Sequence, residues 1–319
     1  MPLIDMPLQE LQQYRGTNPR PDDYDAYWER ALAEMKAVDP RLDLSPAKFQ
    51  TGFADCFDLT FTGVRGARIY AKYARPKKLD GPVPGLLLFH GYSGASCGWT
   101  GLLQYVAAGM AVAALDCRGQ GGRSEDTGGH KGTTYEGHFM RGVEGNPDDM
   151  LMRHIFLDTA QLAGIVHDLP EVDGSRLMAH GGSQGGGLTI ACAGLEPRIT
   201  RLVPMCPFLC DYQRVWEMDL AKSAYDEITY HFRHFDPRHL REREFFTKLG
   251  YVDVQNMAPR IRGELLMATG LMDTVCPPST QYAFFNKVLT EKEVVLYPDF
   301  AHEDYPGFSD IAYQFLCKE

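Results

Sequence analysis

From about residue 83 to the end of the chain, short apolar stretches alternate with segments of helical periodicity. Alternating strand and helix signals are typical of a mostly parallel sheet whose strands are joined by crossover helices. The pattern predicts strands at Leu86–His90, Ala111–Asp116, Arg176–His180, Leu202–Cys206, Glu264–Thr269 and Val294–Tyr297. It predicts helices at Trp99–Ala108, His154–Leu169, Gly186–Gly194, Ser279–Leu289 and Tyr305–Cys317. We therefore expect one doubly wound α/β domain.

The N-terminal part of the chain has a different pattern. Two runs of strand character, Phe57–Thr62 and Ala67–Ala74, flank the turn Gly63–Gly66 and predict an antiparallel hairpin that extends one edge of the sheet. Apolar residues recur at helical spacing over Tyr24–Val38, within an N-terminal helical extension that we place at residues 1–50. We expect this helix to pack against the body of the domain.

The alternation of strands and helices stops after Cys206 and resumes at Glu264. Between them lies an aromatic and charged segment with helical character, Val215–Leu249, inside a helical insertion that we place at residues 207–255. Insertions of this kind commonly cover an active site or form an interface. Residues 1–319 are predicted to form a single α/β domain that includes the N-terminal extension and this insertion.

Composition narrows the function classes. The chain has 44% hydrophobic and 23% charged residues, which is the balance of a globular protein, and its formal net charge of -10 disfavours binding to nucleic acid. Residues 1–10 lack the basic and apolar regions of a signal peptide, and no run approaches the roughly 18 to 20 apolar residues of a membrane span. We expect a soluble, intracellular protein without a membrane partner.

The first chemical signal is the sequence Gly181-x-Ser183-x-Gly185. It matches the nucleophile elbow, a sharp turn between strand and helix that lifts the Ser hydroxyl above the sheet. A chain with 32 Gly produces such a match by chance, so the context decides its value. A predicted strand enters the motif and a helical segment leaves it, which favours the elbow over an ordinary turn.

A nucleophilic Ser needs a general base, and the base needs an orienting carboxylate. On this type of fold the chain order is Ser, then Asp or Glu, then His, each after a later strand. Asp273 follows the strand that begins at Glu264, and His302 follows the last predicted strand. Asp299 and Asp304 compete for the acid role, but both lie too close to His302 along the chain for the usual geometry.

Acyl transfer also needs two backbone N–H groups that stabilise the developing oxyanion. One is expected from Gln184, which follows the nucleophile. The other is expected from the loop after an early strand, where His90–Gly94 follows an apolar run and Tyr92 is the candidate donor. The alternative, that His90 and Gly91 only end a strand, remains open at this stage.

Motifs for cofactors and metals are incomplete. Neither Gly181–Gly187 nor Arg118–Arg123 completes a G-x-G-x-x-G sequence, and the chain has no Gly-Lys-Ser/Thr of a phosphate-binding loop. The group His231, His234 and His239 lies in an Arg-rich segment without a Cys or carboxylate at metal-ligand spacing, and is expected to be solvated surface. We predict no cofactor and no metal.

Three motifs in fixed order, Arg118-Gly-Gln120, Gly181-Gly-Ser-Gln-Gly185 and His302-Glu303, give the chain a family resemblance. It resembles the acetyl xylan esterase/cephalosporin C deacetylase family, carbohydrate esterase family 7 of the α/β-hydrolase superfamily. The likeness covers nearly the whole chain and includes further segments: Pro7–Leu11, Asp58–Gly63, His90–Tyr92, Asp116–Gly122 and Asp273–Pro278.

By position, the resemblance implies the role of each matched residue. Ser183 is the nucleophile, His302 the base and Asp273 its orienting acid, with the oxyanion hole formed by the N–H groups of Tyr92 and Gln184. The motif residues Arg118, Gln120, Gly181, Gly185 and Glu303 are supporting residues, and Arg118 is expected to hold loops through their carbonyl groups. The resemblance also implies a cytoplasmic homo-hexamer whose active sites open to an internal cavity.

Together with the Ser, His and Asp motifs, the resemblance implies a serine esterase that deacetylates small substrates, such as acetylated xylo-oligosaccharides or esters like cephalosporin C, through an acetyl-enzyme. Tyr92 and Pro207–Phe208 are candidates for the wall of a small acyl pocket. Two alternatives remain: a broad-specificity short-chain carboxylesterase or peptidase on the same fold, and a non-catalytic binding module. The intact set of Ser, Asp, His and Gly residues favours an enzyme.

Overall fold

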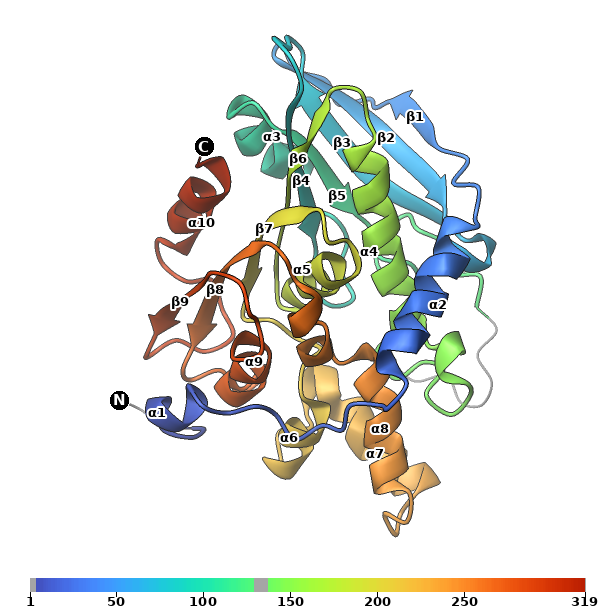
Figure 1. The fold of residues 1–319 in the computed structure, drawn as a ribbon, viewed down its shortest axis with the longest axis vertical. Helices are drawn as coiled ribbons and strands as arrows, with labels where there is room; N and C mark the ends of the chain where they lie inside the picture. Colours follow the sequence, from blue (N-terminus) through green and yellow to red (C-terminus); the bar gives the residue numbers. More distant parts are fainter. Residues whose placement is uncertain (1–3, 129–136, 319) are drawn as a thin grey trace.

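The computed structural model describes residues 4–128 and 137–318. Within these residues lies a nine-stranded sheet with the strand order β1-β2-β3-β5-β4-β6-β7-β8-β9 (Figure 1). The strands are β1 (Asp43–Pro46), β2 (Ala54–Thr62), β3 (Arg68–Pro76), β4 (Val83–Phe89), β5 (Ala111–Leu115), β6 (Val172–Gly182), β7 (Ile199–Met205), β8 (Glu264–Gly270) and β9 (Lys292–Tyr297).

Strands β4 to β9 form a parallel block, and the N-terminal strands join it as an antiparallel meander. Strand β3 pairs with β2 from Thr62↔Arg68 onward, as the hairpin prediction required, and its other side pairs with β5 in antiparallel orientation. In the parallel block, Phe89 is paired with Gly181 and Gly182 with Met205. The carboxyl ends of these strands therefore meet at one edge of the sheet, where the loops that follow them come together.

Helices cover both faces of the sheet (Figure 1). Leu102 and Phe308 belong to a core that α3 and α10 form on one face, whereas Trp28, Phe156 and Leu188 belong to a larger core under α2, α4 and α5 on the other. The helices are α1 (Leu8–Leu11), α2 (Tyr24–Lys36), α3 (Trp99–Ala107), α4 (Leu151–His167), α5 (Gln184–Leu195), α6 (Tyr212–Glu217), α7 (Asp226–Phe235), α8 (Glu242–Leu249), α9 (Pro278–Phe285) and α10 (Phe308–Cys317). In the part of the chain that the structure describes, no helix is both long and apolar enough to cross a membrane.

The predicted strands and helices of the α/β domain are confirmed, with shifts at their ends. Helix α5 starts at Gln184, two residues before the predicted start. Helix α10 starts at Phe308 because Gly307, which precedes it, adopts a left-handed conformation with φ 75°. Part of the expected N-terminal helical extension is different: Asp43–Pro46 forms the edge strand β1, paired with β2. Its four residues, mostly exposed, are too few to show a strand pattern in one sequence.

The N-terminal helix α2 packs on the domain as expected. The ring of Trp28 stacks on Phe156 of α4 with 5.9 Å between ring centroids, and its indole N–H donates to the carbonyl of Tyr251 at 3.1 Å.

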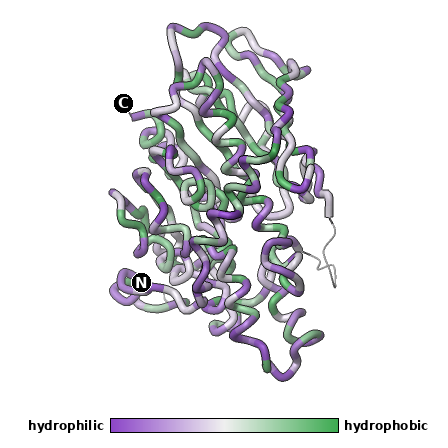
Figure 2. The backbone as a smooth tube through the Cα atoms, turned by 45° about the vertical axis from the view of Figure 1, so that its right-hand side comes forward, coloured by the Kyte–Doolittle hydropathy of each residue, from purple (hydrophilic) through white to green (hydrophobic). Residues whose placement is uncertain are grey.

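The insertion before β8 contains α6, α7 and α8. Figure 2 shows that its projecting tip is mainly hydrophilic, whereas the strands at the centre are mainly hydrophobic. Within the insertion, Tyr212 of α6 and Phe246 of α8 are buried, whereas residues 237–240 between α7 and α8 are exposed.

Candidate active site

Ser183 lies on a strained turn between β6 and α5. Its backbone has φ 54° and ψ -120°, a positive φ that is unfavourable for a residue with a Cβ atom. Two backbone hydrogen bonds hold it there: its N–H donates to the carbonyl of Met205 at 2.9 Å, and its carbonyl accepts from the N–H of Phe208 at 3.0 Å. The segment after β7 therefore clamps the turn on one side.

The two Gly residues that flank Ser183 have no room for a side chain. A Cβ atom on Gly185 would lie 2.2 Å from the carbonyl oxygen of Phe89, and one on Gly181 would lie 2.6 Å from the backbone of Gly185. Contacts below 3 Å force a shift, and here the neighbour is backbone, which cannot swing away. The turn can therefore lie directly against the carboxyl end of β4 only because both positions are Gly.

Ser183, His302 and Asp273 form a continuous chain of hydrogen bonds. The distance between Ser183 Oγ and His302 Nε2 is 2.9 Å, and the distance between His302 Nδ1 and Asp273 Oδ2 is 2.8 Å. Asp273 is fully buried, and its Oδ1 accepts the backbone N–H groups of Val275 and Cys276, each at 2.8 Å. Asp273 therefore presents a fixed oxygen to His302, and the rival acids Asp299 and Asp304 are exposed.

The surroundings of His302 favour its protonated form. Burial lowers the pKa of the imidazole, but hydrogen bonds to Asp273 and to the thiols of Cys206 and Cys276 outweigh this effect and raise the pKa above 6.5. The carboxylate stabilises the positive charge that a general base acquires during proton transfer. A His with this partner is suited to accept the hydroxyl proton of Ser183.

The expected oxyanion donors are near the turn. Gln184 is the first residue of α5, so its N–H is among those that a helix leaves without an intrahelical acceptor. Tyr92 belongs to the loop after β4, and the Gln184 amide group approaches the carbonyls of His90 and Gly91 in that loop, both at 3.5 Å. The Gln184 side chain thus contacts the loop that carries Tyr92, and the oxyanion role of the two N–H groups stays a prediction.

The motif residue Gln120 contacts the turn directly. Its side-chain amide exchanges two hydrogen bonds with that of Gln184, at 2.9 and 3.0 Å. Glu303 orders the loop that carries His302. Its carboxylate accepts the N–H of Ala301 at 3.0 Å and closes the turn around His302. Both residues therefore order loops around the site through these hydrogen bonds.

Arg118 is fully buried, and its main partner differs from the expected loop carbonyls. The guanidinium forms two hydrogen bonds with Asp158 of α4, at 2.5 and 2.6 Å, and only one with a carbonyl, that of Val64 at 3.2 Å. Burial raises the pKa of Asp158, and the charge of Arg118 opposes that rise. Arg118 therefore ties the loop after β5 to α4 through a buried, bidentate ion pair.

The expectation of a solvated His group is wrong for His231. Its side chain is buried, stacks on Phe245 with 4.2 Å between centroids and lies 3.0 Å from a carboxylate oxygen of Glu144. It lies on the face of α7 that packs inward, so burial follows from the helical position and not from the Arg-rich composition. His234 and His239 are exposed, as expected.

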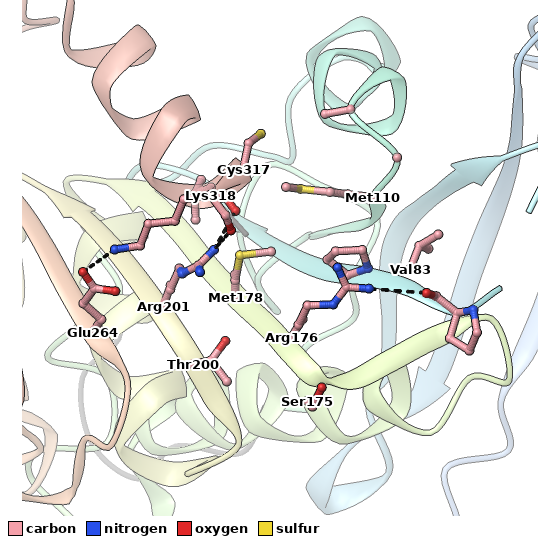
Figure 3. Close-up of a pocket in the computed structure, with 15 residues that line it drawn as sticks. Val83, Met110, Ser175, Arg176, Met178, Thr200, Arg201, Glu264, Cys317 and Lys318 are labelled. Atoms are coloured by element: carbon pink, nitrogen blue, oxygen red, sulfur yellow. Dashed lines mark hydrogen bonds and ion pairs between the residues drawn. The ribbon is translucent and has the colours of Figure 1, made fainter. Parts of the chain in front are cut away.

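A cavity of about 640 Å³ lies away from Ser183, at the amino-terminal ends of the parallel strands (Figure 3). Its wall includes Glu264, at the start of β8, and the end of α10. Its charged groups have partners: Lys318 pairs with Glu264, Arg176 with Asp173, and Arg201 donates to backbone carbonyls near the end of α10. Catalytic groups on such sheets gather at the opposite, carboxyl edge, so we do not assign this cavity to the candidate active site.

Several residues at the site were not predicted. Cys206, Cys276 and Tyr305 surround the loops of His302 and Asp273, and the hydroxyl of Tyr305 accepts the N–H of Gly270 at 2.8 Å. Asp158 of α4 bonds the motif residue Arg118, and Glu227 of α7 bonds the hydroxyl of Tyr92. Their only common sequence signal is a polar residue next to a predicted strand end or within an apolar helical face, which is too weak to single them out.

A strained Ser after a central parallel strand, with an acid and a His after later strands, defines the α/β-hydrolase fold. A family model described as acetyl xylan esterase (AXE1) matches residues 1–319, and the chain belongs to this family. The similarity therefore extends well beyond the residues of the elbow.

Solved structures of two relatives agree. The chain is similar to acetyl xylan esterase 1 from Thermoanaerobacterium sp. JW/SL YS485, with 58% identity, 98% of each chain covered and a TM-score of 0.97. It is also similar to the acetyl xylan esterase from Paenibacillus sp. R4, with 35% identity, 98% of this chain and 99% of that chain covered, and a TM-score of 0.93. Acetyl esterase Axe7A of Xylanibacter ruminicola is 28% identical over 284 residues, which are 87% of this chain but only 62% of that relative's length.

Proposed function

We propose that this chain is a serine esterase that removes acetyl groups from small esters through an acetyl-enzyme. The observation that carries the proposal is the hydrogen-bonded chain from Ser183 Oγ through His302 to the buried Asp273. Membership of the acetyl xylan esterase family supports the acetyl group as the acyl part. We assign the nucleophile to Ser183, the base to His302 and the orienting acid to Asp273.

In the acylation step, Ser183 Oγ attacks the acetyl carbonyl carbon while His302 Nε2 takes the hydroxyl proton. The hydrogen bond from Nδ1–H to Asp273 holds the tautomer in which Nε2 is free to accept that proton. The C–O bond of the ester then breaks, and the same proton passes to the departing alkoxide oxygen. The products are an acetyl-Ser183 ester and an alcohol.

In the deacylation step, His302 takes a proton from water, whose oxygen attacks the acetyl-enzyme, and passes that proton to Ser183 as the ester bond breaks. Acetic acid leaves and loses its own proton to the solvent. Each tetrahedral intermediate carries negative charge on the former carbonyl oxygen. We assign the backbone N–H groups of Tyr92 and Gln184 to that oxygen, because backbone donors fixed in advance stabilise such charge without reorganisation.

The acyl pocket is proposed to be small and aromatic. The ring of Phe208 meets that of Tyr92 edge to face, with 5.3 Å between centroids, and the Phe208 N–H is bonded to the Ser183 carbonyl. Rigid aromatic groups this close to the nucleophile favour a two-carbon acyl group over longer chains. Acetylated xylo-oligosaccharides and acetyl esters like cephalosporin C are the substrate classes we propose.

The decisive variant is Ser183→Ala, compared with wild type and with the matched control Ser175→Ala at an exposed position. We expect acetate release from acetylated xylo-oligosaccharides to fall by about 10⁴-fold or more in Ser183→Ala and to be unchanged in the control. Retained turnover would refute the mechanism. Rates on acetyl, butyryl and longer p-nitrophenyl esters and on a peptide amide separate deacetylation from broad esterase or peptidase activity.

We also propose that the protein is cytoplasmic and assembles as a homo-hexamer, as the family resemblance implies. Enclosed active sites would restrict substrates to small molecules. Light scattering on the purified protein tests the assembly: a mass of one or two chains would contradict it.

A further inference from the structure

The side-chain hydroxyl of Tyr92 is held by three groups. Its oxygen accepts the backbone N–H of His138 at 2.5 Å and that of Phe139 at 3.1 Å. A hydroxyl has two lone pairs and one proton, so these two contacts leave the proton to be donated. The acceptor is Oε2 of Glu227, at 3.5 Å.

Glu227 comes from α7, within the helical insertion, and is only 7% exposed. Its second oxygen, Oε1, accepts the backbone N–H of Gly137 at 3.0 Å. Burial raises the pKa of this carboxyl to about 7, against the opposing effect of N–H donors from Gly137 and Met140 and of the charge on Arg141. One carboxyl group therefore joins the insertion to the segment 137–139 and to the Tyr92 hydroxyl.

The ring of Tyr92 is confined as well as its hydroxyl. It lies edge-on to His138 and to Phe208, with centroid distances of 5.1 and 5.3 Å. The backbone of Phe208 is bonded to Ser183, as described above. A side chain fixed at both its ring and its tip leaves its own backbone little freedom to turn.

We infer that Glu227 is a positioning residue for the oxyanion hole: it holds the Tyr92 hydroxyl and the segment 137–139 so that the Tyr92 N–H points at the reacting carbonyl. This inference rests on the proposed function, which gives that N–H its role. It also assigns a task to the insertion, which completes the oxyanion hole from outside the α/β domain.

The test is a double-mutant cycle with Glu227→Gln, Tyr92→Phe and the double variant. Tyr92→Phe keeps the ring and the backbone N–H but removes the hydroxyl through which Glu227 acts. We expect each single variant to lower kcat on an acetyl ester about 10- to 100-fold with KM changed less than about threefold, because the oxyanion forms only in the transition state. The double variant should lose no more than the more impaired single variant.

A second readout reports on the oxyanion directly. A trifluoromethyl ketone adds to a serine nucleophile and places an oxyanion in the hole, so its inhibition constant should rise in parallel with the loss of kcat. The control is Glu244→Gln on α8, an exposed position in the same insertion, which should leave kcat and the inhibition constant unchanged. A serine-directed organophosphonate is allowed to react to completion with each variant. The fraction of the protein that it labels measures the fraction with a folded active site.

The proposal is overturned if Glu227→Gln keeps kcat within twofold of wild type, or if the effects of the two single variants multiply in the double variant. If Glu227→Gln labels poorly because it does not fold, Tyr92→Phe decides alone: an unchanged kcat and inhibition constant overturn the proposal. Failure of the serine mechanism is recognised separately, by full turnover in Ser183→Ala.

Discussion

Gln120 and Gln184 lock the loop after β5 to the first turn of α5 through two reciprocal amide hydrogen bonds of 2.9 and 3.0 Å. Gln184 is the residue whose backbone N–H we assign to the oxyanion hole, and its side chain is fully buried. The pair therefore fixes the orientation of a peptide group that must be in place before the reaction begins. Gln120 is therefore connected to the proposed oxyanion hole although it lies far from Ser183 in the sequence.

Gln120→Ala should lower kcat/KM on an acetyl ester by about 10-fold. The substitution removes both amide hydrogen bonds between the two side chains, and each lost hydrogen bond is worth about 0.5–1.5 kcal/mol. The measurement is steady-state kinetics, with Gln104→Ala on the exposed side of α3 as control. Equal activity of the two variants would show that the amide pair does not order the site.

Asp273→Asn should reduce kcat by about 10³- to 10⁴-fold, because an amide no longer enforces the tautomer that His302 needs. The remaining activity should also shift in pH. The carboxylate raises the pKa of His302, so its loss lowers that pKa and moves the acid limb of the kcat/KM profile to lower pH. In the control variant Asp299→Asn, the kcat/KM profile should keep its position along the pH axis. A shift of that profile would mean that Asp299, and not Asp273, is the acid that orients His302.

Gly185→Ala should destabilise the fold by more than about 2 kcal/mol and abolish most activity, because its Cβ would meet the Phe89 carbonyl oxygen at 2.2 Å. Gly52→Ala is the matched control, since a Cβ there has no atom within 4 Å. Urea unfolding measures both variants. Gly185→Ala with wild-type stability would mean that β4 and the turn can move apart.

Asp253, which accepts the N–H of Asp211, should make the unfolding free energy fall as pH rises from about 4 to 7. Burial and the charge of Asp211 raise its pKa from 3.8 to about 7. Between these values the folded state binds more protons than the unfolded state, so stability is lost as pH rises. In Asp253→Asn this component, on the order of 1–4 kcal/mol, should vanish from the pH dependence of urea unfolding.

The exposed variant Asp43→Asn controls for general effects of removing a charge. An identical pH dependence in wild type and Asp253→Asn would contradict the assignment.

The periodic pattern of the chain predicted the parallel strands well because the central ones, such as β5 and β8, are buried on both faces and read as continuous apolar runs. The hairpin of β2 and β3 was predictable for a related reason: its turn is marked by Gly63 and Gly66 between two strand-like runs. Strand β1 was missed because four residues with mostly exposed side chains carry no alternation. Local signals therefore decided how well each element could be predicted.

For the site, chain order was sufficient to select Ser183, Asp273 and His302. Parallel strands place their following loops at one edge of the sheet, so position along the chain translates into proximity. The partners of those residues were not predictable in this way. Arg118 met Asp158 instead of loop carbonyls, and His231 was buried instead of solvated, because both depend on how helices far apart in sequence pack together.

The sequence by itself thus determined the fold class, the order of the elements and the identity of the residues proposed for chemistry, because these follow from local periodicity and from the topology it implies. Only the tertiary structure decided which side chains support them. The contact between Glu227 and Tyr92 spans 135 residues along the chain, and a hydrogen bond between such distant groups leaves no local pattern. It exists because the insertion folds back over the loop after β4.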